Sequence, residues 1–363
     1  MKWSCGNMKS LIQEIVRFTE DKRLRWHFCR ELECIKRNAE KDRFVLSKEQ
    51  EKSVRDFYKK YGFYDVDLRW HRYIYAHTGK FDVKFIPEDF YHNVIERILA
   101  KKKSEWEDKS YMSRFLPIAN FPGCIVRNVN GYYINNDEKI ISKNEAVKLI
   151  KNSSEKIIIK PTKQSGSGKG VSLIDIDSFD INNIENTYKK DFIFQTKIKQ
   201  HKIHGSFNES SVNTEKIISM LFNGKVYILT SILRVGAPGS IVDTASTGSG
   251  YTVGINDDGR LNCEGYTIFG KSIFENAAKQ KLSEIVLPAH TIILDKIREY
   301  HEYMPYFGII SWDFAVNENG MPILIEYNLG YPDVMIYQMN NGALFGDKTE
   351  DVLKYCYLAI KER

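Results

Sequence analysis

The order of apolar and polar residues divides the chain into a helical first part and a longer part rich in strands. From residue 8 to about residue 60, apolar residues recur at steps of three and four with charged residues between them, which predicts amphipathic helices. These apolar positions are Leu11, Ile15, Phe18, Leu24, Phe28, Leu32 and Ile35. From Tyr61 the sequence becomes aromatic and mixed, with a helix expected after Pro87.

Beyond about Lys109 the pattern changes to short strands separated by turn residues, which predicts an α+β fold. Hairpin turns are expected at Asn130-Gly131, at Asn223-Gly224 and at the NENG sequence of residues 317–320. The expected strands are Cys124–Asn128, Gly131–Asn135, Lys156–Lys160, Gly170–Asp175, Phe192–Thr196, Thr214–Phe222, Lys225–Val235, Ile309–Val316 and Pro322–Asn328.

Residues 157–174, IIIKPTKQSGSGKGVSLI, place a glycine-serine loop with lysines between two of these strands. The spacing is neither that of a Walker A loop nor that of the dinucleotide-binding fingerprint. A hairpin whose tip has few side chains can still fold over a polyphosphate, with Lys160 supplying a point charge. The stretch therefore predicts a nucleotide lid or, on glycine content alone, an ordinary flexible hairpin loop.

The NENG turn sets which side chains of its two flanking strands share a face. A turn of two or four residues pairs Val316 with Met321. Asp313 then lies opposite Leu324 and diagonal to Glu326, on one face. A three-residue turn would instead move Asp313 to the opposite face. We expect the shared face, because the flanking residues are apolar and carboxylates among them need a compensating cation.

Asn328, two residues after Glu326, falls on the same face as Asp313. Two carboxylates and an amide oxygen suit Mg²⁺, which takes one or two carboxylates and completes its shell with waters and phosphate oxygens. Mn²⁺ is an alternative occupant. The competing interpretation is a pair of solvent-facing acids on an edge hairpin.

The glycine loop and the carboxylate hairpin complement each other, since a lid over phosphates needs Mg²⁺ beside it. In this chain order they resemble the ATP-grasp superfamily and, more narrowly, the sugar-transfer-associated ATP-grasp family found among polysaccharide-biosynthesis genes. The matching stretches begin at Phe81 and are FDVKFIPEDFY, CIVRNVNGYYI, KPTKQSGSGKGV, NESSVNTEKII, ILRVG, VDTASTG, ISWDFAV, ILIEYNLG and QMNNGALFGD.

The resemblance implies an ATP-grasp fold in which two α+β subdomains sandwich ATP, preceded by a helical and mixed N-terminal region. The expected division is a helical region over 1–60, a mixed region over 61–108, a subdomain with the glycine-rich lid over 109–195 and a subdomain with the metal site over 196–363. ATP and Mg²⁺ are the implied cofactors.

By the same resemblance, two lysines should contact the ATP phosphates, a glycine loop should close over them, and a hinge should meet the adenine edge. The lysines are Lys109 and Lys160, the loop residues are Ser165, Gly166, Ser167, Gly168 and Gly170, and the hinge residues are Gln195, Thr196, Lys197 and Ile198. The family often has an acidic residue where Thr196 stands, so this position departs from the pattern.

Further residues match the catalytic, metal and substrate positions of the family. Lys216 stands where arginine is expected, and Arg234 is retained; both are candidate catalytic residues. Asp313, Glu326 and Asn328 match the metal ligands, and Asn213, Asp243 and Ser246 are candidate substrate contacts, the last two within the loop Val242–Gly250.

The resemblance implies an ATP-dependent ligase that activates a carboxylate as an acyl phosphate and joins it to an amine in capsule or O-antigen polysaccharide biosynthesis. A small-molecule kinase of the same fold is one alternative, and detection of a phosphorylated product without an amine would identify it. A non-catalytic nucleotide-binding scaffold in glycan assembly is another, to which the change to Lys216 gives some weight.

Composition supports a globular chain of 363 residues, with 42% hydrophobic and 28% charged residues. The start lacks the apolar run of a signal peptide and no stretch approaches the ~20 apolar residues of a membrane span, so we expect a cytoplasmic protein. The cysteines show no zinc spacing, and the net charge of +6 is spread along the chain, so no nucleic-acid partner is expected. The oligomeric state stays open.

Overall fold

The structure is a computed structural model that describes residues 45–100, 104–163, 168–243, 249–330 and 332–362, together with Arg30, Glu33 and Arg37. The chain forms two compact units. The smaller comprises residues 1–99, 269–271 and 333–363, and the larger comprises residues 100–268 and 272–332. No helix among the described residues combines the length and apolar character that a bilayer crossing needs.

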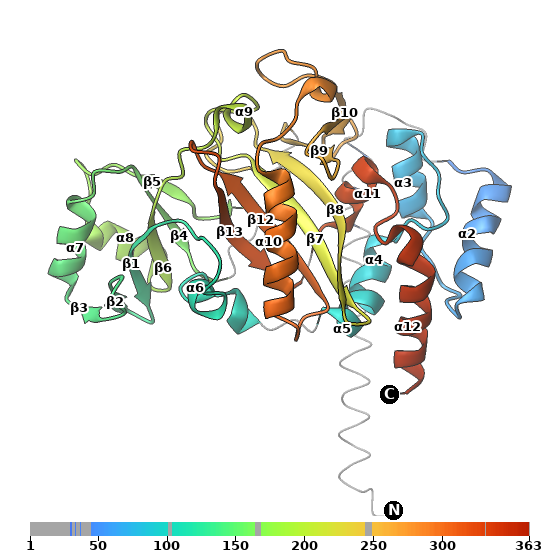
Figure 1. The fold of residues 1–363 in the computed structure, drawn as a ribbon, viewed down its shortest axis with the longest axis horizontal. Helices are drawn as coiled ribbons and strands as arrows, with labels where there is room; N and C mark the ends of the chain where they lie inside the picture. Colours follow the sequence, from blue (N-terminus) through green and yellow to red (C-terminus); the bar gives the residue numbers. More distant parts are fainter. Residues whose placement is uncertain are drawn as a thin grey trace, which may run out of the picture. The chain divides into compact units, whose positions relative to one another are not determined.

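The larger unit contains two antiparallel sheets (Figure 1). The first has the strand order β3-β2-β1-β6-β4-β5 and is flanked by two helices. Its elements are β1 (Cys124–Val129), β2 (Tyr132–Ile134), β3 (Ile140–Ile141), α7 (Lys143–Lys151), β4 (Ile157–Pro161), β5 (Ser172–Ile174), α8 (Ile181–Tyr188) and β6 (Phe192–Thr196).

Strand alternation gives this first sheet one apolar and one polar face. Ile157 and Ile159 on β4 pack with Phe194 on β6 in a buried core that also includes residues of α7 and α8. Lys160, next to Ile159 on the same strand, therefore lies on the other face. A capping box between Ser142 and Glu145 fixes the start of α7.

The second sheet has the strand order β11-β10-β9-β8-β7-β12-β13, and α10 (His290–Tyr303) lies along it (Figure 1). Ile217, Trp312 and Leu324 pack with Ile293 and Ile297 of α10 in a buried cluster. The strands are β7 (Thr214–Phe222), β8 (Lys225–Val235), β9 (Tyr251–Ile255), β10 (Leu261–Tyr266), β11 (Ser272–Ile273), β12 (Ile309–Val316) and β13 (Pro322–Asn328). Short helical elements of the unit are η2 (Ser104–Glu107), α6 (Met112–Phe115), α9 (Lys202–Gly205) and η5 (Leu282–Glu284).

The bounds of β6, β7, β8, β12 and β13 agree with the sequence-based expectation, and those of β1, β2, β4 and β5 differ from it by a few residues. The strands β3, β9, β10 and β11 were not expected. β10 has the sequence LNCEGY, in which Asn, Glu and Gly are poor strand formers, so its pairing with β9 and β11 decides its conformation.

The register expected for the β12–β13 hairpin is wrong, although its conclusion about Asp313 holds. Val316 pairs with Pro322 and not with Met321, because the turn has three residues closed by the Asn317 N–H donating to the Met321 carbonyl at 3.0 Å. Gly320 takes the left-handed conformation, with φ 78°, that such a turn requires.

A β-bulge in β13 then restores the shared face. The register shifts by one between Phe314 and Asp313, so Phe314 pairs with Leu324 while Asp313 pairs with Glu326. Ile325 is the extra residue of the bulge. The odd turn and the bulge together place Asp313 directly opposite Glu326, where the sequence predicted a diagonal pair.

The smaller unit is helical in the described residues. Its elements are α2 (Lys48–Lys60), α3 (Arg69–Thr78), α4 (Glu88–Phe90), the π-helical turn η1 (Tyr91–Ile95), α5 (Glu96–Leu99), α11 (Val334–Asn341), η6 (Gly346–Lys348) and α12 (Thr349–Lys361). The helix expected after Pro87 is confirmed by α4, η1 and α5. Apart from Arg30, Glu33 and Arg37, which are helical, the helices expected before residue 45 lie outside the described residues.

Buried polar contacts join the C-terminal helices to the N-terminal ones within this unit. Gln338 on α11 accepts from the N–H of Ile86 at 2.7 Å and donates to its carbonyl at 2.8 Å. Glu88 accepts from the first N–H groups of α11, those of Val334 and Met335, at 3.1 and 2.9 Å. Residues 333–363, expected within the segment 196–363, thus group with the N-terminal helices.

His92 holds two buried carboxylates together in this unit. Its Nε2 lies 3.1 Å from Glu88 and its Nδ1 lies 2.5 Å from Glu96. Burial alone would lower the pKa of His92, but hydrogen bonds and charge attraction from the two carboxylates outweigh it and raise the pKa to about 10. The protonated imidazole therefore links α5 through Glu88 to the start of α11.

We predict that this imidazole makes stability fall with rising pH. The folded pKa lies above the unfolded value, so the stabilisation is complete below about pH 6.5 and is lost as pH rises toward 10. Urea unfolding at pH 6, 8 and 10 should show the wild type losing stability relative to His92→Gln. His71→Gln is the control between pH 8 and 10, since burial lowers the pKa of His71 to about 4 and this imidazole is neutral there in both the folded and the unfolded state; a wild-type curve parallel to that of His92→Gln over that range would contradict the prediction.

Candidate functional site

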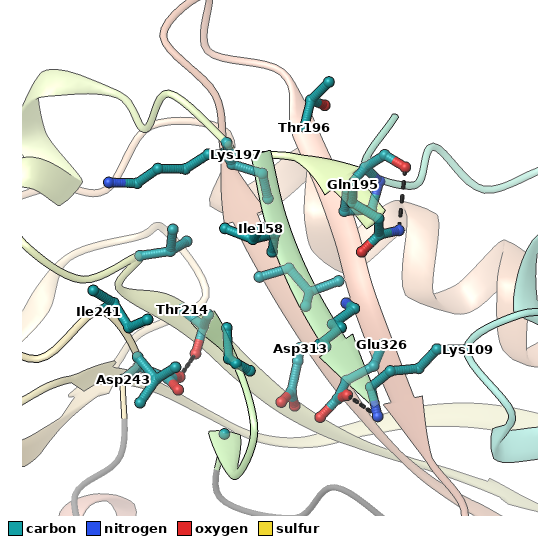
Figure 2. Close-up of a pocket in the computed structure, with 18 of the residues that line it drawn as sticks. Lys109, Ile158, Gln195, Thr196, Lys197, Thr214, Ile241, Asp243, Asp313 and Glu326 are labelled. Atoms are coloured by element: carbon teal, nitrogen blue, oxygen red, sulfur yellow. Dashed lines mark hydrogen bonds and ion pairs between the residues drawn. The ribbon is translucent and has the colours of Figure 1, made fainter. Parts of the chain in front are cut away.

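The polar faces of the two sheets in the larger unit line one cavity. Nineteen residues line it, from both sheets and the segments between them: Lys109, Pro122, Ile158, Lys160, Gly168, Val171, Leu173, Gln195, Thr196, Lys197, Ile198, Val212, Thr214, Ile241, Val242, Asp243, Asp313, Ile325 and Glu326. Figure 2 shows Asp313 and Glu326 side by side, with Lys109 next to them and the hinge residues at the other end.

Two lysines pair with the two central carboxylates. Lys216 bonds Asp313 from the neighbouring strand, where the two residues are directly opposite. Lys109 Nζ lies 2.8 Å from Glu326 Oε2 (Figure 2). The positive charges thus compensate carboxylates that would otherwise be costly inside an apolar strand pair.

The two carboxyl groups differ in their acidity. Burial raises the pKa of Asp313, and Lys216 only partly offsets this effect. Burial alone would raise the pKa of Glu326 too, but the charges of Lys109, Lys160 and Lys216 outweigh it and hold the pKa of Glu326 well below its usual range. Glu326 is therefore the firmly ionised member of the pair.

Lys160 is a buried ammonium that makes no hydrogen bond or ion pair with the residues the structure describes. Only 5% of its surface is exposed. Burial and, to a smaller extent, the positive charge of Lys109 lower the pKa of Lys160 to about 8, against the attraction of Glu326. An anion is the group that would compensate this charge.

The donor set fits a hard divalent cation. Asp313 Oδ1 is buried with no hydrogen-bond partner among the described residues, and Glu326 lies opposite it. The described part of the chain has no group of three or more His, Cys, Asp or Glu side chains that could hold a metal ion. Asn328 lies two residues beyond Glu326 and pairs with Ser311, but it does not line the cavity.

The hinge residues Gln195 to Ile198 all line the cavity, but two of their N–H groups already have partners. The N–H of Thr196 donates to Gly123 at 2.9 Å and that of Lys197 to Lys156 at 2.7 Å. Among the described backbone groups, the N–H of Ile198 has no such partner. It is therefore the hinge N–H that can donate a hydrogen bond to a ligand in the cavity.

The candidate substrate and catalytic residues are divided between the cavity and its surroundings. Asp243 lines the cavity and accepts from the Thr214 hydroxyl (Figure 2). Arg234 pairs with Thr214 across β7 and β8 and does not line the cavity. Asn213 is fully buried, and its amide donates to the carbonyls of His204 and Asn208 at 2.8 and 2.9 Å, so it holds a loop.

Glycines allow the lid strand to approach its neighbours closely. A Cβ on Gly168 would lie 2.9 Å from Val242, and one on Gly170 would lie 2.9 Å from the ring of Pro161. Both glycines have positive φ, at 69° and 74°. Of the other candidate residues, Ser165, Gly166, Ser167 and Ser246 lie outside the described residues.

Sequence reasoning missed the apolar walls of the cavity. Ile158, Val171, Leu173 and Ile325 line it beside the hinge and were not singled out. Ile158 could have been found, because it lies two residues before Lys160 and strand alternation puts both on one face. Ile325 could not, because only the bulge turns it to the face of Glu326.

The sequence was compared with known proteins and structures. No match to a curated protein was found. Among solved structures, the L-amino acid ligase of Bacillus licheniformis is 13% identical, with a TM-score of 0.39 over 69% of this chain and 47% of that one. The biotin carboxylase of Campylobacter jejuni is 12% identical, with a TM-score of 0.44 over 69% and 46%. D-alanyl-alanine synthetase A of Vibrio cholerae is 12% identical, with a TM-score of 0.41 over 72% and 66%.

The chain spans about half the length of the first two structures. The model of the sugar-transfer associated ATP-grasp family matches residues 107–354, which is more than half of the chain. The fold is accordingly the α+β ATP-grasp fold expected from the sequence, with two antiparallel sheets and a helical N-terminal region. The chain belongs to the sugar-transfer associated ATP-grasp family.

Proposed function

We propose that this protein is an ATP-dependent ligase that phosphorylates a carboxylate and joins the resulting acyl phosphate to an amine. The observation that carries the proposal is the convergence of Asp313, Glu326, Lys109 and Lys160 on one cavity, with Lys216 bonded to Asp313 and the residues Gln195 to Ile198 at the other end. Such a site is suited to positioning a polyphosphate and neutralising its charge, which is most of the catalysis in phosphoryl transfer.

In this proposal the adenine lies against the apolar walls beside the hinge, with the Ile198 N–H as donor. Lys160 and Lys109 meet the phosphates, because both ammonium groups line the cavity and Lys160 has no partner of its own. The glycine loop, of which Gly168 and Gly170 are described, covers the phosphates with backbone N–H groups.

Asp313 and Glu326 would hold Mg²⁺ or Mn²⁺, with Asn328 as a further oxygen ligand. The cation, when bound, supplies charge neutralisation at the phosphate oxygens. With the cation bound, its charge would compensate the two carboxylates. Lys216 and Lys109 could then leave Asp313 and Glu326 and contact phosphate oxygens instead. Lys216 stabilises the transferring phosphoryl group as a point charge, whereas an arginine at this position would form two parallel hydrogen bonds to it.

The acceptor end of the site lies around Asp243, which lines the same cavity as the carboxylate pair and whose charge helps to raise the pKa of Asp313. An acidic group there suits an amine, which it attracts as the ammonium and from which it can accept a proton. Arg234, a strand neighbour of Thr214 that does not itself line the cavity, is the residue we propose to orient the substrate carboxylate. The link of the family to sugar transfer supports a role in capsule or O-antigen polysaccharide assembly, in the cytoplasm where ATP is available.

ATP with Mg²⁺ should stabilise the protein through Lys160. At a nucleotide concentration ~100 times the dissociation constant, binding adds roughly 2.7 kcal/mol to the free energy of unfolding. Thermal denaturation with and without Mg·ATP should show this shift in the wild type and in Lys156→Ala, whose side chain is exposed on the same strand region, but a smaller one in Lys160→Ala. An equal shift in all three proteins would show that Lys160 does not contribute to nucleotide binding.

Turnover should depend on Glu326 and on two substrates. Glu326→Gln should lower ADP release about 100-fold or more, because the ionised carboxylate that would hold the cation beside the phosphates is lost. Glu318→Gln, in the exposed turn of the same hairpin, is the matched control and should keep wild-type turnover. ADP release that needs no amine and leaves a stable phosphorylated product would show a kinase instead.

The buried charge of Lys160 should cost stability in the absence of ligand. Its folded pKa of about 8 lies below the usual value, so the cost is complete below pH 8 and vanishes as pH rises toward 10.5. Lys160→Met should therefore raise the free energy of unfolding by about 1–3 kcal/mol at pH 7 and by little at pH 10. Urea unfolding checks this, with Lys156→Met expected to stay within about 0.5 kcal/mol of wild type.

A further inference from the structure

A second cavity lies beside the candidate nucleotide site in the larger unit. It has a volume of about 270 Å³ and is lined by residues of β1, α6 and the segment before β1. Lys109, Lys160 and Gln195 line both cavities. The two spaces are therefore neighbours that share two cations, and the second has room for several waters or a small organic molecule.

The lining of this second cavity is positively charged. It contains Lys109, Arg127 and Lys160 and no acidic side chain. Lys109 bonds Glu326, and Arg127 bonds Glu138, which also bonds Arg114. Lys160 has no partner among the described residues, so an anion is the ligand that this charge favours.

Three residues that line the same cavity each carry a buried hydrogen-bonding atom without a partner among the described residues. The Ser110 hydroxyl oxygen and Arg127 Nε are two of them, in side chains of residues that are 1% and 3% exposed. Leaving such groups unsatisfied costs free energy, which a bound acceptor would recover. Both groups donate, as does the Lys160 ammonium, so the lining offers donors that suit an anion with several acceptor oxygens.

Gln195 adds a group of the opposite kind. Its side-chain Oε1 is a buried acceptor with no partner in the described residues, while its Nε2 donates to the Pro122 carbonyl at 3.4 Å. An acceptor next to the donors suits a hydroxyl group on the same ligand. The cavity thus matches a small phosphate ester that carries a hydroxyl.

We propose that the second cavity is a phosphate-binding site distinct from the nucleotide site, with Ser110 and Arg127 as donors to the phosphate group and with the charge of Lys160 shared between the two sites. Lys109 and Lys160 line both cavities. An anion in the second cavity is therefore attracted by the same two positive charges that attract the ATP phosphates. Occupancy of either cavity therefore weakens binding in the other, by the same factor in both directions.

The test is isothermal titration calorimetry of the full chain saturated with Mg²⁺ and the non-hydrolysable ATP analogue AMPPNP, with inorganic phosphate and glycerol 3-phosphate as probes. We expect at least one probe to bind. Its affinity should fall tenfold or more in Arg127→Gln and about threefold or more in Ser110→Ala, while the affinity for AMPPNP stays within about twofold.

Glu138→Gln is the matched control, because it breaks the same ion pair as Arg127→Gln but leaves the cavity lining intact. It should bind the probes at least as well as wild type. If Arg127→Gln does not fold, Ser110→Ala against Glu138→Gln gives the same comparison.

Tighter binding of glycerol 3-phosphate assigns the cavity to a phosphate ester, and tighter binding of inorganic phosphate assigns it to free phosphate. The proposal is overturned if neither probe binds the nucleotide-loaded protein, or if binding is the same in wild type, Ser110→Ala and Arg127→Gln. Both outcomes are independent of whether the enzyme is a ligase, because no turnover is measured.

Discussion

The pairing of lysines with carboxylates inside the larger unit is the interaction on which the site depends. Asp313 and Glu326 face each other across β12 and β13 among apolar neighbours, and neither could remain ionised there without Lys216 and Lys109. The third lysine, Lys160, is left in excess. The group formed by Asp313, Glu326 and these three lysines thus has a net positive charge, which a bound polyanion would neutralise.

This net charge favours binding of a nucleotide. The nucleotide is not needed to form the cavity. The strands, the hinge and the carboxylate pair are placed by cores on the outer faces of the two sheets, where α7, α8 and α10 pack. Under the ligase proposal, the lysines have only to move from the carboxylates to the substrate phosphates, within a site that is already formed. The chemistry then needs short movements of long lysine side chains and little change in backbone.

Much of the fold could be predicted from periodicity, because β7, β8, β12 and β13 are long and apolar and end at clear turns. The convergence of Asp313 and Glu326 was also predicted, but through a register that the hairpin does not have. A three-residue turn and a bulge each shift the pairing by one, and neither leaves a signal in the alternation of residues. The lysine–carboxylate pairs, the second cavity and the grouping of residues 333–363 with N-terminal helices depend on tertiary contacts, and no local pattern encodes them.

The bulge at Ile325 behaves as a one-residue insertion that leaves the pairing of its neighbours untouched. Removing Ile325 would let Leu324 and Glu326 follow each other in a regular ladder, still opposite Phe314 and Asp313. The inserted residue is therefore not needed to bring the carboxylates together; it adds an apolar side chain to the wall shared by both cavities. Residue 325 is consequently a position at which related chains could change the shape of the partition between the cavities without disturbing the acidic pair beside it.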